Sequence, residues 1–500
     1  MEKREHWKSK FGFILAATGG AIGLGNIWRF PYITGKNGGA AFVLIYIGCC
    51  IIVGIPLILA ELSLGRRSQK DAVGTFKVIK PGSRWFWIGG MGVVVGYLIL
   101  SYYSVVAGWT IGYFFESLLG TFRKLGSPQA VASYFDTFAA SPLKAIGFQG
   151  VFIALCMIIV IRGIQGGIER ACKLLMPTLF GILIICIIRS ITLKGSLAGL
   201  TFFIKPDFSQ LSTQAIFEAL GQSFFTLSLG MGAVITYGSY LTKKDNLATS
   251  GVMIAFLDTL IAILAGFAIF PAIFAFGLPP DQGPGLVFRS LTNVFNAMPG
   301  GAIFGPLFFF LLIIAAVTSG ISLLEVITAY FVDQKGWSRR KTVLTMGTAS
   351  FLLGIPSALS FGHLQGVHIL GKTPFGFVES LTANYMLPLG GLMMSVFVAY
   401  IWGGKEAIAE VKIGNPAFLT GRIWIFLLRY ICPFIVAQIL LFGILSEFTS
   451  PGVISFADML RHYLSIIDIV IAAGVIIGGA IYIISIKRAK KGEQNPTPSM

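Results

Sequence analysis

The sequence predicts an all-α polytopic membrane protein of about twelve transmembrane helices. Hydrophobic residues make up 55% of the 500 residues, charged residues only 12%, and the mean hydropathy is +0.82. A soluble domain carries about twice that share of charged residues, which keep its surface in water. Apolar runs of about 20 residues, each long enough to cross hydrocarbon, recur from end to end. The chain is therefore expected to cross a bilayer many times.

The apolar runs define the expected spans in order along the chain. They cover residues 11–34, 39–64, 85–118, 147–162, 172–189, 214–242, 247–277, 301–332, 342–357, 375–402, 420–446 and 464–486. The first run continues past the length of a signal peptide and lacks a small-residue cleavage site, so we do not expect it to be removed. The stretch 282–298 is too short and too polar to span, which predicts an amphipathic lid helix between the seventh and eighth spans.

A net charge of +17 would suit a nucleic-acid-binding protein, but the positions of the basic residues favour a membrane topology. Alternate loops hold these residues by about three to one, as the positive-inside rule requires of cytoplasmic loops. The clusters are Lys3, Arg4, Lys8 and Lys10; Arg66, Arg67, Lys70, Lys77, Lys80 and Arg84; Arg339, Arg340 and Lys341; and Lys487, Arg488, Lys490 and Lys491. We expect a plasma-membrane protein with both termini in the cytoplasm and no nucleic-acid partner.

Two spans contain glycine clusters beside polar residues. The first reads ATGGAIGLGN over residues 17–26, and the sixth reads FFTLSLGMG over residues 224–232. Glycines destabilise helix interiors, and interrupted helices in corresponding positions of two halves indicate an inverted-repeat transporter with its site at the breaks. Close helix packing at glycine is the alternative for either segment alone. A phosphate-binding loop is excluded, since the required strand and Lys-Ser/Thr pair are missing.

These segments resemble the neurotransmitter:sodium symporter family. The similarity is carried by GLGNIWRFPY at 23–32, NGGAAF at 37–42, IRGIQGGIER at 161–170, QSFFTLSLGMG at 222–232 and AAVTS at 315–319. The resemblance implies a bacterial amino-acid transporter, not an enzyme, with a LeuT-like repeat of five plus five helices and helices 1 and 6 unwound at mid-membrane. The expected parts are an N-tail (1–10), a first repeat (11–190), an inverted second repeat (213–403), helices 11 and 12 (420–487) and a cytoplasmic tail (488–500).

The resemblance also places a substrate site at the breaks. The backbone at Leu24 and Gly25, with the Tyr103 hydroxyl, would bind a carboxylate at the positive end of a half-helix. Members that carry monoamines have an aspartate where this chain has Gly23, so the substrate here should bring its own carboxylate. The full expected set is Gly20, Ala21, Leu24, Gly25, Ile99, Tyr103, Phe225, Thr226, Ser228, Met231, Ser319 and Leu323. The set is uncharged, which favours neutral, hydrophobic or aromatic side chains.

Two sodium sites follow from the same resemblance, since Na⁺ prefers hard oxygen ligands. The first would use Ala21, Asn26, Thr226 and Asp258 together with the substrate carboxylate. The second would use Gly19, Ile22 and Ala315 with the hydroxyls of Thr318 and Ser319. Hydrogen bonding of these two hydroxyls to their own helix is the alternative.

Asp258 replaces the asparagine usual in the family, and an acid inside a span indicates function. Tyr46, Gln222 and Thr226 match the surroundings of the chloride that many animal members need, whereas Ala262 stands in place of a serine or a compensating glutamate. One hypothesis is that Asp258 supplies the negative charge and makes transport chloride-independent. The other is that Asp258 carries a proton on the return step.

The resemblance also implies an outer gate and a cytoplasmic gate. Arg29 would pair with Glu379 above a lid of Tyr103 and Phe225, and Arg4, Trp7, Ser239, Tyr240 and Asp333 would form a cytoplasmic latch. Arg4 and Asp333 could instead be ordinary solvated charges. We expect sodium-coupled import of neutral L-amino acids by alternating access, with two Na⁺ per substrate. A channel or transport-like sensor for the same ions remains the alternative. No signal for an oligomeric state is present.

Overall fold

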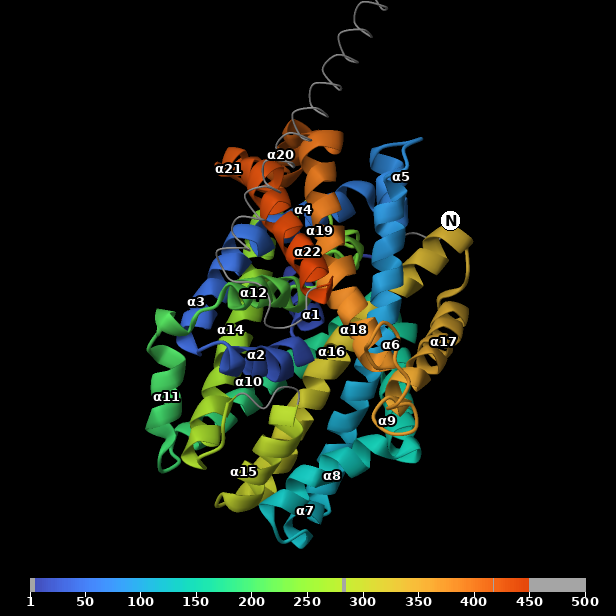
Figure 1. The fold of residues 1–500 in the computed structure, drawn as a ribbon. Helices are drawn as coiled ribbons and strands as arrows, with labels where there is room; N and C mark the ends of the chain where they lie inside the picture. The colour runs from blue at the N-terminus through green and yellow to red at the C-terminus, as the bar shows by residue number, and fades with distance from the viewer. Residues whose placement is uncertain (1–4, 281–284, 417, 449–500) are drawn as a thin grey trace, which may run out of the picture. The chain divides into compact units, whose positions relative to one another are not determined.

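The computed structural model describes residues 5–280, 285–416 and 418–448. The chain divides into two units, of which the first is Met1–Leu441 and the second Phe442–Met500. The described residues are mostly helical, with one isolated β-bridge between Ile369 and Lys372. The predicted all-α class is thereby confirmed (Figure 1). The predicted twelfth span (464–486), the C-terminal tail and Arg4 lie outside the described residues.

Nine helical segments within the described residues are long and apolar enough to cross a membrane, and one bent pair of helices passes the same test. The bent pair joins Lys10–Ala21 to Gly25–Lys36 at 50°. The nine are Ala40–Ser68, Phe86–Leu118, Pro142–Ile161, Ile164–Ile191, Leu247–Ala275, Gly301–Lys335, Arg339–Leu359, Pro374–Lys412 and Gly421–Leu441. They match predicted spans, while the predicted sixth span forms two shorter helices, α12 (Thr213–Thr226) and α13 (Ala233–Gly238).

The first four spans comprise α1 (Lys10–Ala21), η1 (Gly25–Arg29), α2 (Phe30–Lys36), α3 (Ala40–Cys49), η2 (Cys50–Gly54), α4 (Ile55–Ser68), α6 (Phe86–Leu118) and α9 (Pro142–Ile161). The fifth comprises η3 (Ile164–Glu169) and α10 (Arg170–Ile191), and the seventh and eighth are α14 (Leu247–Ala275) and α16 (Gly301–Lys335). The ninth to eleventh comprise α17 (Arg339–Leu359), α18 (Pro374–Ser380), η6 (Leu381–Met386), α19 (Leu387–Val396), η7 (Phe397–Gly403), α20 (Gly404–Lys412), α21 (Gly421–Phe426), η8 (Leu427–Ile431) and α22 (Cys432–Phe448).

Short helices occupy the connections between spans. They are α5 (Ala72–Ile79), α7 (Thr121–Lys124), α8 (Pro128–Ala140), α11 (Ser196–Ile204), η4 (Phe208–Gln210), η5 (Leu286–Leu291) and α15 (Thr292–Ala297). Helices η5 and α15 lie where the sequence predicted a lid helix. The fifth span begins earlier than predicted, at Ile164, because Gly163 adopts φ +83 and turns the chain directly into the π-helical turn η3.

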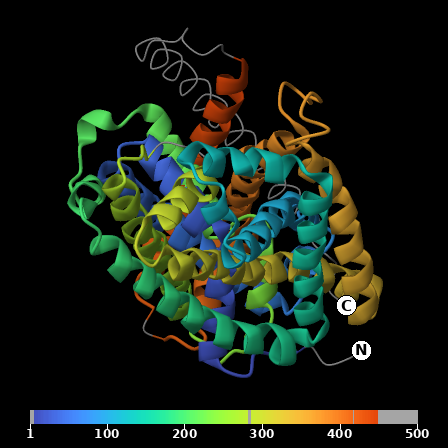
Figure 2. The ribbon, with the colours of Figure 1, turned by 90° about the horizontal axis from the view of Figure 1, so that it is seen from below.

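The long helices α6 and α16 pack along each other and form the centre of the first unit. Residues on α16 from Ala315 to Ala329 are all buried, which places this helix among the others rather than against lipid. Figure 2 shows α11 and α17 on opposite sides of the bundle. The central position of α16 brings its small residues to the broken helix α1, with which it is in contact.

Asp71 begins α5 and gives a first testable expectation. Its Oδ1 accepts hydrogen bonds from the N–H groups of Val73 (2.9 Å) and Gly74 (3.2 Å), and Gln334 Nε2 donates to Oδ2 at 2.6 Å. We expect Asp71→Ala to destabilise the protein by about 1–2 kcal/mol, because a helix cap is lost and the half-buried Gln334 amide loses its acceptor.

The matched control is Asp71→Asn, which keeps the capping oxygen but turns its NH₂ group towards Gln334 Nε2 and so loses only that hydrogen bond. Burial raises the pKa of the Asp71 carboxyl, so a neutral side chain should be tolerated here. Thermal unfolding in detergent should therefore place Asp71→Asn between wild type and Asp71→Ala. Equal melting temperatures for Ala and Asn variants would contradict this role of Asp71.

Candidate functional site

The two helix breaks face each other around a cavity. Helix α1 ends at Ala21 and η1 begins at Gly25, while α12 ends at Thr226 and α13 begins at Ala233. Between α12 and α13, Ser228, Gly230 and Gly232 all adopt positive φ, a conformation that interrupts any right-handed helix. Each break leaves backbone N–H and C=O groups without helical partners and available to a ligand.

The cavity is lined by uncharged residues. Ten of the twelve predicted substrate residues line it, together with Gly23: Gly20, Ala21, Gly25, Ile99, Tyr103, Phe225, Ser228, Met231, Ser319 and Leu323. The other two predicted residues, Leu24 and Thr226, do not line the cavity. The Leu24 N–H donates to the Tyr103 hydroxyl at 3.2 Å, and the Thr226 hydroxyl lies 3.1 Å from that of Tyr46.

Hydroxyl groups draw the first break towards α16. Ser319 Oγ lies 3.2 Å from the carbonyl oxygen of Gly20 and 3.1 Å from that of Ile22, and Ser228 Oγ lies 3.3 Å from the same Gly20 oxygen. Gly23 fits only because it lacks a side chain: a Cβ there would stand 2.3 Å from Ser319 Oγ and 2.8 Å from the Tyr103 hydroxyl. These contacts give the cavity a small, fixed polar end.

The residues predicted for a second sodium site form a cluster of oxygens. Thr318 Oγ1 lies 3.4 Å from the Ile22 carbonyl oxygen, 3.1 Å from that of Ile314 and 3.0 Å from that of Ala315. A hydroxyl carries a single hydrogen and cannot donate to three acceptors at once. Ser319 Oγ also lies near the Ile22 carbonyl oxygen. This cluster of neutral oxygens suits a small hard cation.

The residues predicted for a first sodium site meet at Asn26. Its Oδ1 accepts from the Gly23 N–H at 3.0 Å, and its Nδ2 donates to Asp258 Oδ1 at 2.8 Å. Asp258 is fully buried, and its second oxygen, Oδ2, has no hydrogen-bond partner. A buried carboxylate with a free oxygen is stabilised by a proton or by a counter-charge, and a cation between Asn26, Thr226 and Asp258 would provide the latter.

The predicted outer gate has a different arrangement from the expected ion pair. Arg29 Nη1 donates to Gln222 Oε1 at 2.7 Å, and its guanidinium carbon lies 5.0 Å from the centre of the Phe225 ring. Gln222 Nε2 in turn donates to the Gly25 carbonyl at 2.8 Å. Glu379 interacts electrostatically with Arg29 without forming an ion pair among the described residues. Pairing of Arg29 with Glu379 stays a prediction.

At the N-terminal end, Trp7 packs against α13 and the residues that follow it. Trp7 Nε1 donates to the Tyr237 carbonyl at 3.1 Å, and its ring contacts those of Tyr237 and Tyr240. Of the other predicted latch residues, Ser239 donates to the Thr236 carbonyl, and Asp333 accepts from the Asp71 N–H at 2.8 Å. Trp7 and Tyr240 thus come together, whereas Asp333 binds the start of α5.

Sequence reasoning missed three buried carboxylates that hold these parts in place. Glu61 Oε1 accepts from the Gly230 N–H at 2.8 Å and fixes the second break. Glu325 accepts from the Tyr240 hydroxyl and pairs with Arg339. Glu169 accepts from the Lys8 N–H at 2.7 Å and the Ser9 hydroxyl at 3.0 Å. An acid inside an apolar run was the available signal for Glu61 and Glu325.

Comparisons with known proteins agree with this architecture. Residues 4–125 and 148–484 match the Sodium:neurotransmitter symporter family. An uncharacterised sodium-dependent transporter of Bacillus subtilis is 40% identical over 89% of this chain and 99% of its own length. The sodium- and chloride-dependent glycine transporter 1 of Xenopus laevis is 28% identical over 89% of this chain and 78% of its own. The crystal structure of MhsT in complex with L-phenylalanine has a TM-score of 0.82 and 46% identity, covering 88% of this chain and 99% of MhsT.

Proposed function

This chain belongs to the sodium:neurotransmitter symporter family, a family of membrane transporters and not of enzymes, and on that premise we propose that it imports neutral, apolar L-amino acids together with Na⁺. The single observation that carries the substrate class is the uncharged cavity between the two breaks. Its polar end offers backbone groups and the Tyr103 hydroxyl to a carboxylate, and its walls offer Ile99, Phe225 and Leu323 to an apolar side chain. MhsT, which is similar throughout, was crystallised with L-phenylalanine.

The substrate's carboxylate has a defined role in this proposal. The Tyr103 hydroxyl accepts from Leu24, so its own hydrogen remains available to donate to a carboxylate oxygen. Because Gly23 supplies no charge, the negative group near the first sodium site comes from the substrate and from Asp258. A biogenic amine, which lacks a carboxylate, would leave the exposed N–H groups of the break unmatched.

Two sodium ions fit the two oxygen clusters described above. The first is assigned to Ala21, Asn26, Thr226, Asp258 and the substrate carboxylate, and the second to Gly19, Ile22, Ala315, Thr318 and Ser319. At about 100 mV and a tenfold gradient, two ions provide about 7 kcal/mol, which allows accumulation of about 10⁵-fold. With one ion the accumulation limit is only about 500-fold. The assigned stoichiometry therefore makes the transporter a strong concentrator.

Transport would proceed by alternating access, in the plasma membrane with both termini in the cytoplasm. The broken first and sixth spans, with the second and seventh, would rock against the rest as an inverted five-plus-five repeat. Arg29 would exchange Gln222 for Glu379 as the outer gate changes state. Trp7, Tyr240 and Asp333 would serve the inner gate, which must open to release the solute.

Uptake into proteoliposomes tests the proposal. An imposed inward Na⁺ gradient should drive saturable uptake of at least one apolar L-amino acid, and chloride replacement by gluconate should leave it unchanged. Flux without saturation would favour a channel, and sodium-dependent binding without flux would favour a sensor. The absence of a response to every apolar amino acid in sodium would refute the assigned substrate class.

Thr318→Ala provides the matched test of the second sodium site. Loss of one cation-binding oxygen, worth about 1.5–3 kcal/mol, should raise the half-saturating Na⁺ concentration at least tenfold. The control is Thr328→Ala on the same helix, where the buried hydroxyl only donates to the Leu324 carbonyl at 2.7 Å. If the two variants needed the same Na⁺ concentration, Thr318 would have no role beyond its own helix.

A further inference from the structure

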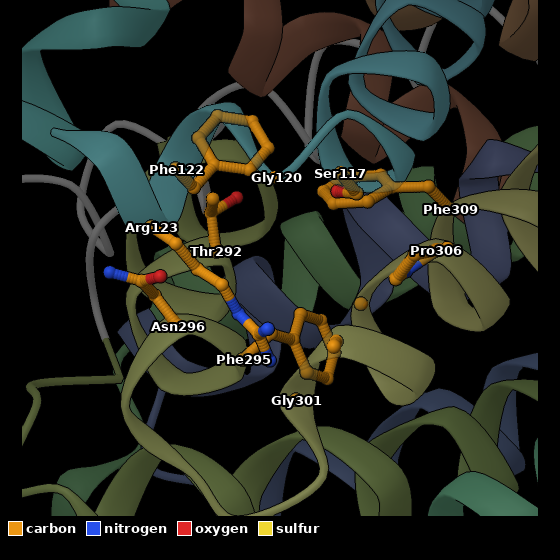
Figure 3. A pocket seen from close by; sticks show the side chains of 12 residues that line it. Ser117, Gly120, Phe122, Arg123, Thr292, Phe295, Asn296, Gly301, Pro306 and Phe309 are labelled. Carbon is orange, nitrogen blue, oxygen red and sulfur yellow. The ribbon is translucent and has the colours of Figure 1, made fainter.

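An apolar groove lies on the outer surface of the bundle, where α4, α14 and α21 meet. Its volume is about 610 Å³, within the range of about 300–1,000 Å³ that is usual for pockets that bind small molecules. The cleft between α7, α15 and the start of α16 (Figure 3) has a volume of only about 30 Å³, which is room for a water molecule or two. The groove is therefore large enough for a ligand, whereas that cleft is not.

The groove has a fixed apolar floor and an open apolar rim. The residues buried at its floor are Pro56, Leu59, Phe418 and Trp424. The Trp424 indole N–H donates to the Pro56 carbonyl at 3.0 Å, which joins α21 to α4. The exposed residues at its rim are Ile51, Val252, Phe256 and Ile423. Because all four belong to helices long and apolar enough to span a membrane, the open side of the groove faces lipid hydrocarbon.

The groove is elongated along the helices. Its lining extends from Ala248 to Phe256 on α14 and from Ile51 to Leu59 along η2 and α4. Each stretch advances eight residues (256 − 248 and 59 − 51), or about 12 Å at 1.5 Å per residue. The hydrocarbon of one leaflet is about 15 Å thick, half of the bilayer core. The length of the groove thus matches an acyl chain lying within a single leaflet.

Two loops meet at one end of the groove. Thr249, at the start of α14, and Thr420, just before α21, both line this end. A Cβ at Gly414 would stand 2.8 Å from the Asp245 carbonyl oxygen, and Arg66 Nη1 donates to the carbonyls of both Asp245 and Ile413. The loop before α14 and the loop before α21 are therefore close neighbours.

These loops carry an excess of positive charge. Residues 242–246 and 411–422 contain one acid, Asp245, and four basic residues: Lys243, Lys244, Lys412 and Arg422. Asp245 Oδ2 already accepts from the N–H and the hydroxyl of Thr242, both at 2.8 Å. None of the four cations forms an ion pair with another described residue. One end of the apolar groove is thus positively charged and offers two threonine hydroxyls.

We propose that the groove binds one anionic phospholipid of the surrounding membrane. Its phosphate would meet Lys244 and Arg422, and one acyl chain would lie along the groove against Trp424 and Phe256. A zwitterionic phospholipid is a poorer match, because its own cationic group would be repelled by these side chains. A small soluble anion would leave the apolar length of the groove empty. The site goes beyond the proposed transport function, since no residue assigned to the substrate or to sodium lines it.

Trp424 allows the occupant to be detected, because a brominated acyl chain quenches the fluorescence of a tryptophan that it touches. The full-length protein is reconstituted into phosphatidylcholine vesicles that contain increasing fractions of dibrominated phosphatidylglycerol or, in a second series, dibrominated phosphatidylcholine. The Trp424 signal is the emission of wild type minus that of Trp424→Phe. We expect half-quenching at about 2 mol% of the brominated anionic lipid, about 30-fold less than for the zwitterionic one, since two cations contribute about fivefold each.

Removal of the cations should remove the preference. Lys244→Gln and Arg422→Gln should each lower it about fivefold, and the double variant should be quenched equally by the two lipids. Lys341→Gln is the matched control, because Lys341 is an exposed lysine in the first turn of α17 and outside the groove lining. This variant should keep the wild-type preference.

Val252→Phe tests the groove by filling it. Val252 is 49% exposed at the rim, so the melting temperature in detergent should stay at the wild-type value. The fraction of brominated phosphatidylglycerol needed to quench Trp424 should rise at least about tenfold. An unchanged fraction would show that the acyl chain does not lie in the groove and would overturn the proposal.

Three further results would also overturn it. Equal quenching of wild type by the two lipids would make the groove an ordinary lipid-facing surface. Quenching by neither lipid would show that protein covers the groove. A wild-type preference in the Lys244→Gln/Arg422→Gln double variant would show that these cations do not bind the headgroup. The measurements use neither Na⁺ nor an amino acid, so their failure would leave the proposed transport function untouched.

Discussion

Asp258→Asn is expected to remove most sodium-driven uptake in chloride-free medium. The substitution keeps the size of the side chain and an oxygen for the Asn26 amide, which donates to Asp258 Oδ1 at 2.8 Å. It removes the negative charge, however, and a charged hydrogen-bonding partner is worth about 1.5–3 kcal/mol, or roughly 10- to 150-fold in affinity for the first sodium ion. The half-saturating Na⁺ concentration, measured by substrate binding, should rise accordingly.

The double variant Asp258→Asn/Ala262→Ser separates the two hypotheses for Asp258. Ala262 is buried one helical turn along α14 from Asp258, so a serine there would point the same way and offer a donor to an anion. If Asp258 replaces chloride, the double variant should regain uptake when external chloride is added, while wild type remains indifferent to it. If Asp258 carries a proton on the return step, chloride should restore nothing, and substrate exchange should survive while net uptake is lost.

The match between sequence and structure is strongest where the backbone itself is unusual. The glycine clusters at 19–25 and 230–232 indicated interrupted helices because glycine both weakens a helix and permits positive φ. The structure has α1 end at Ala21 and gives Gly230 and Gly232 φ values of +78 and +76. Apolar run length likewise located the spans, since the bilayer sets the length of any crossing helix.

Contacts between distant segments were not predictable in the same way. Glu61 binds the Gly230 N–H across 169 residues, and Glu169 binds the N-terminal segment at Lys8 and Ser9. Only the packing of α4 beside the second break, and of the N-terminal segment beside η3, brings these groups together. Arg29 likewise donates to Gln222, 193 residues away, a contact that the sequence pattern did not indicate.

Gly23→Ala is expected to reduce amino-acid binding by about 5- to 150-fold, because one added methyl group overpacks the polar end of the cavity at a cost of about 1–3 kcal/mol. Its Cβ would stand 2.3 Å from Ser319 Oγ. To remove this clash, Ser319 would have to turn away from the carbonyls of Gly20 and Ile22. The second sodium site should therefore weaken as well. Both the substrate Kd and the half-saturating Na⁺ concentration should therefore rise in sodium-dependent binding assays.

A series of glycine-to-alanine substitutions, graded by how closely the added Cβ meets its neighbours, controls for a general effect of alanine in these helices. A Cβ at Gly20 would meet Ser322 Cβ at 3.0 Å, and one at Gly19 would meet the flexible Met176 side chain at 3.1 Å. At Gly48, in the second span, nothing lies within 4 Å. Loss of binding should follow the order Gly23, Gly20, Gly19, Gly48, with Gly48→Ala equal to wild type. An unaffected Gly23→Ala variant would show that Ser319 and Tyr103 do not hold the break as placed, and the carboxylate would then need another site.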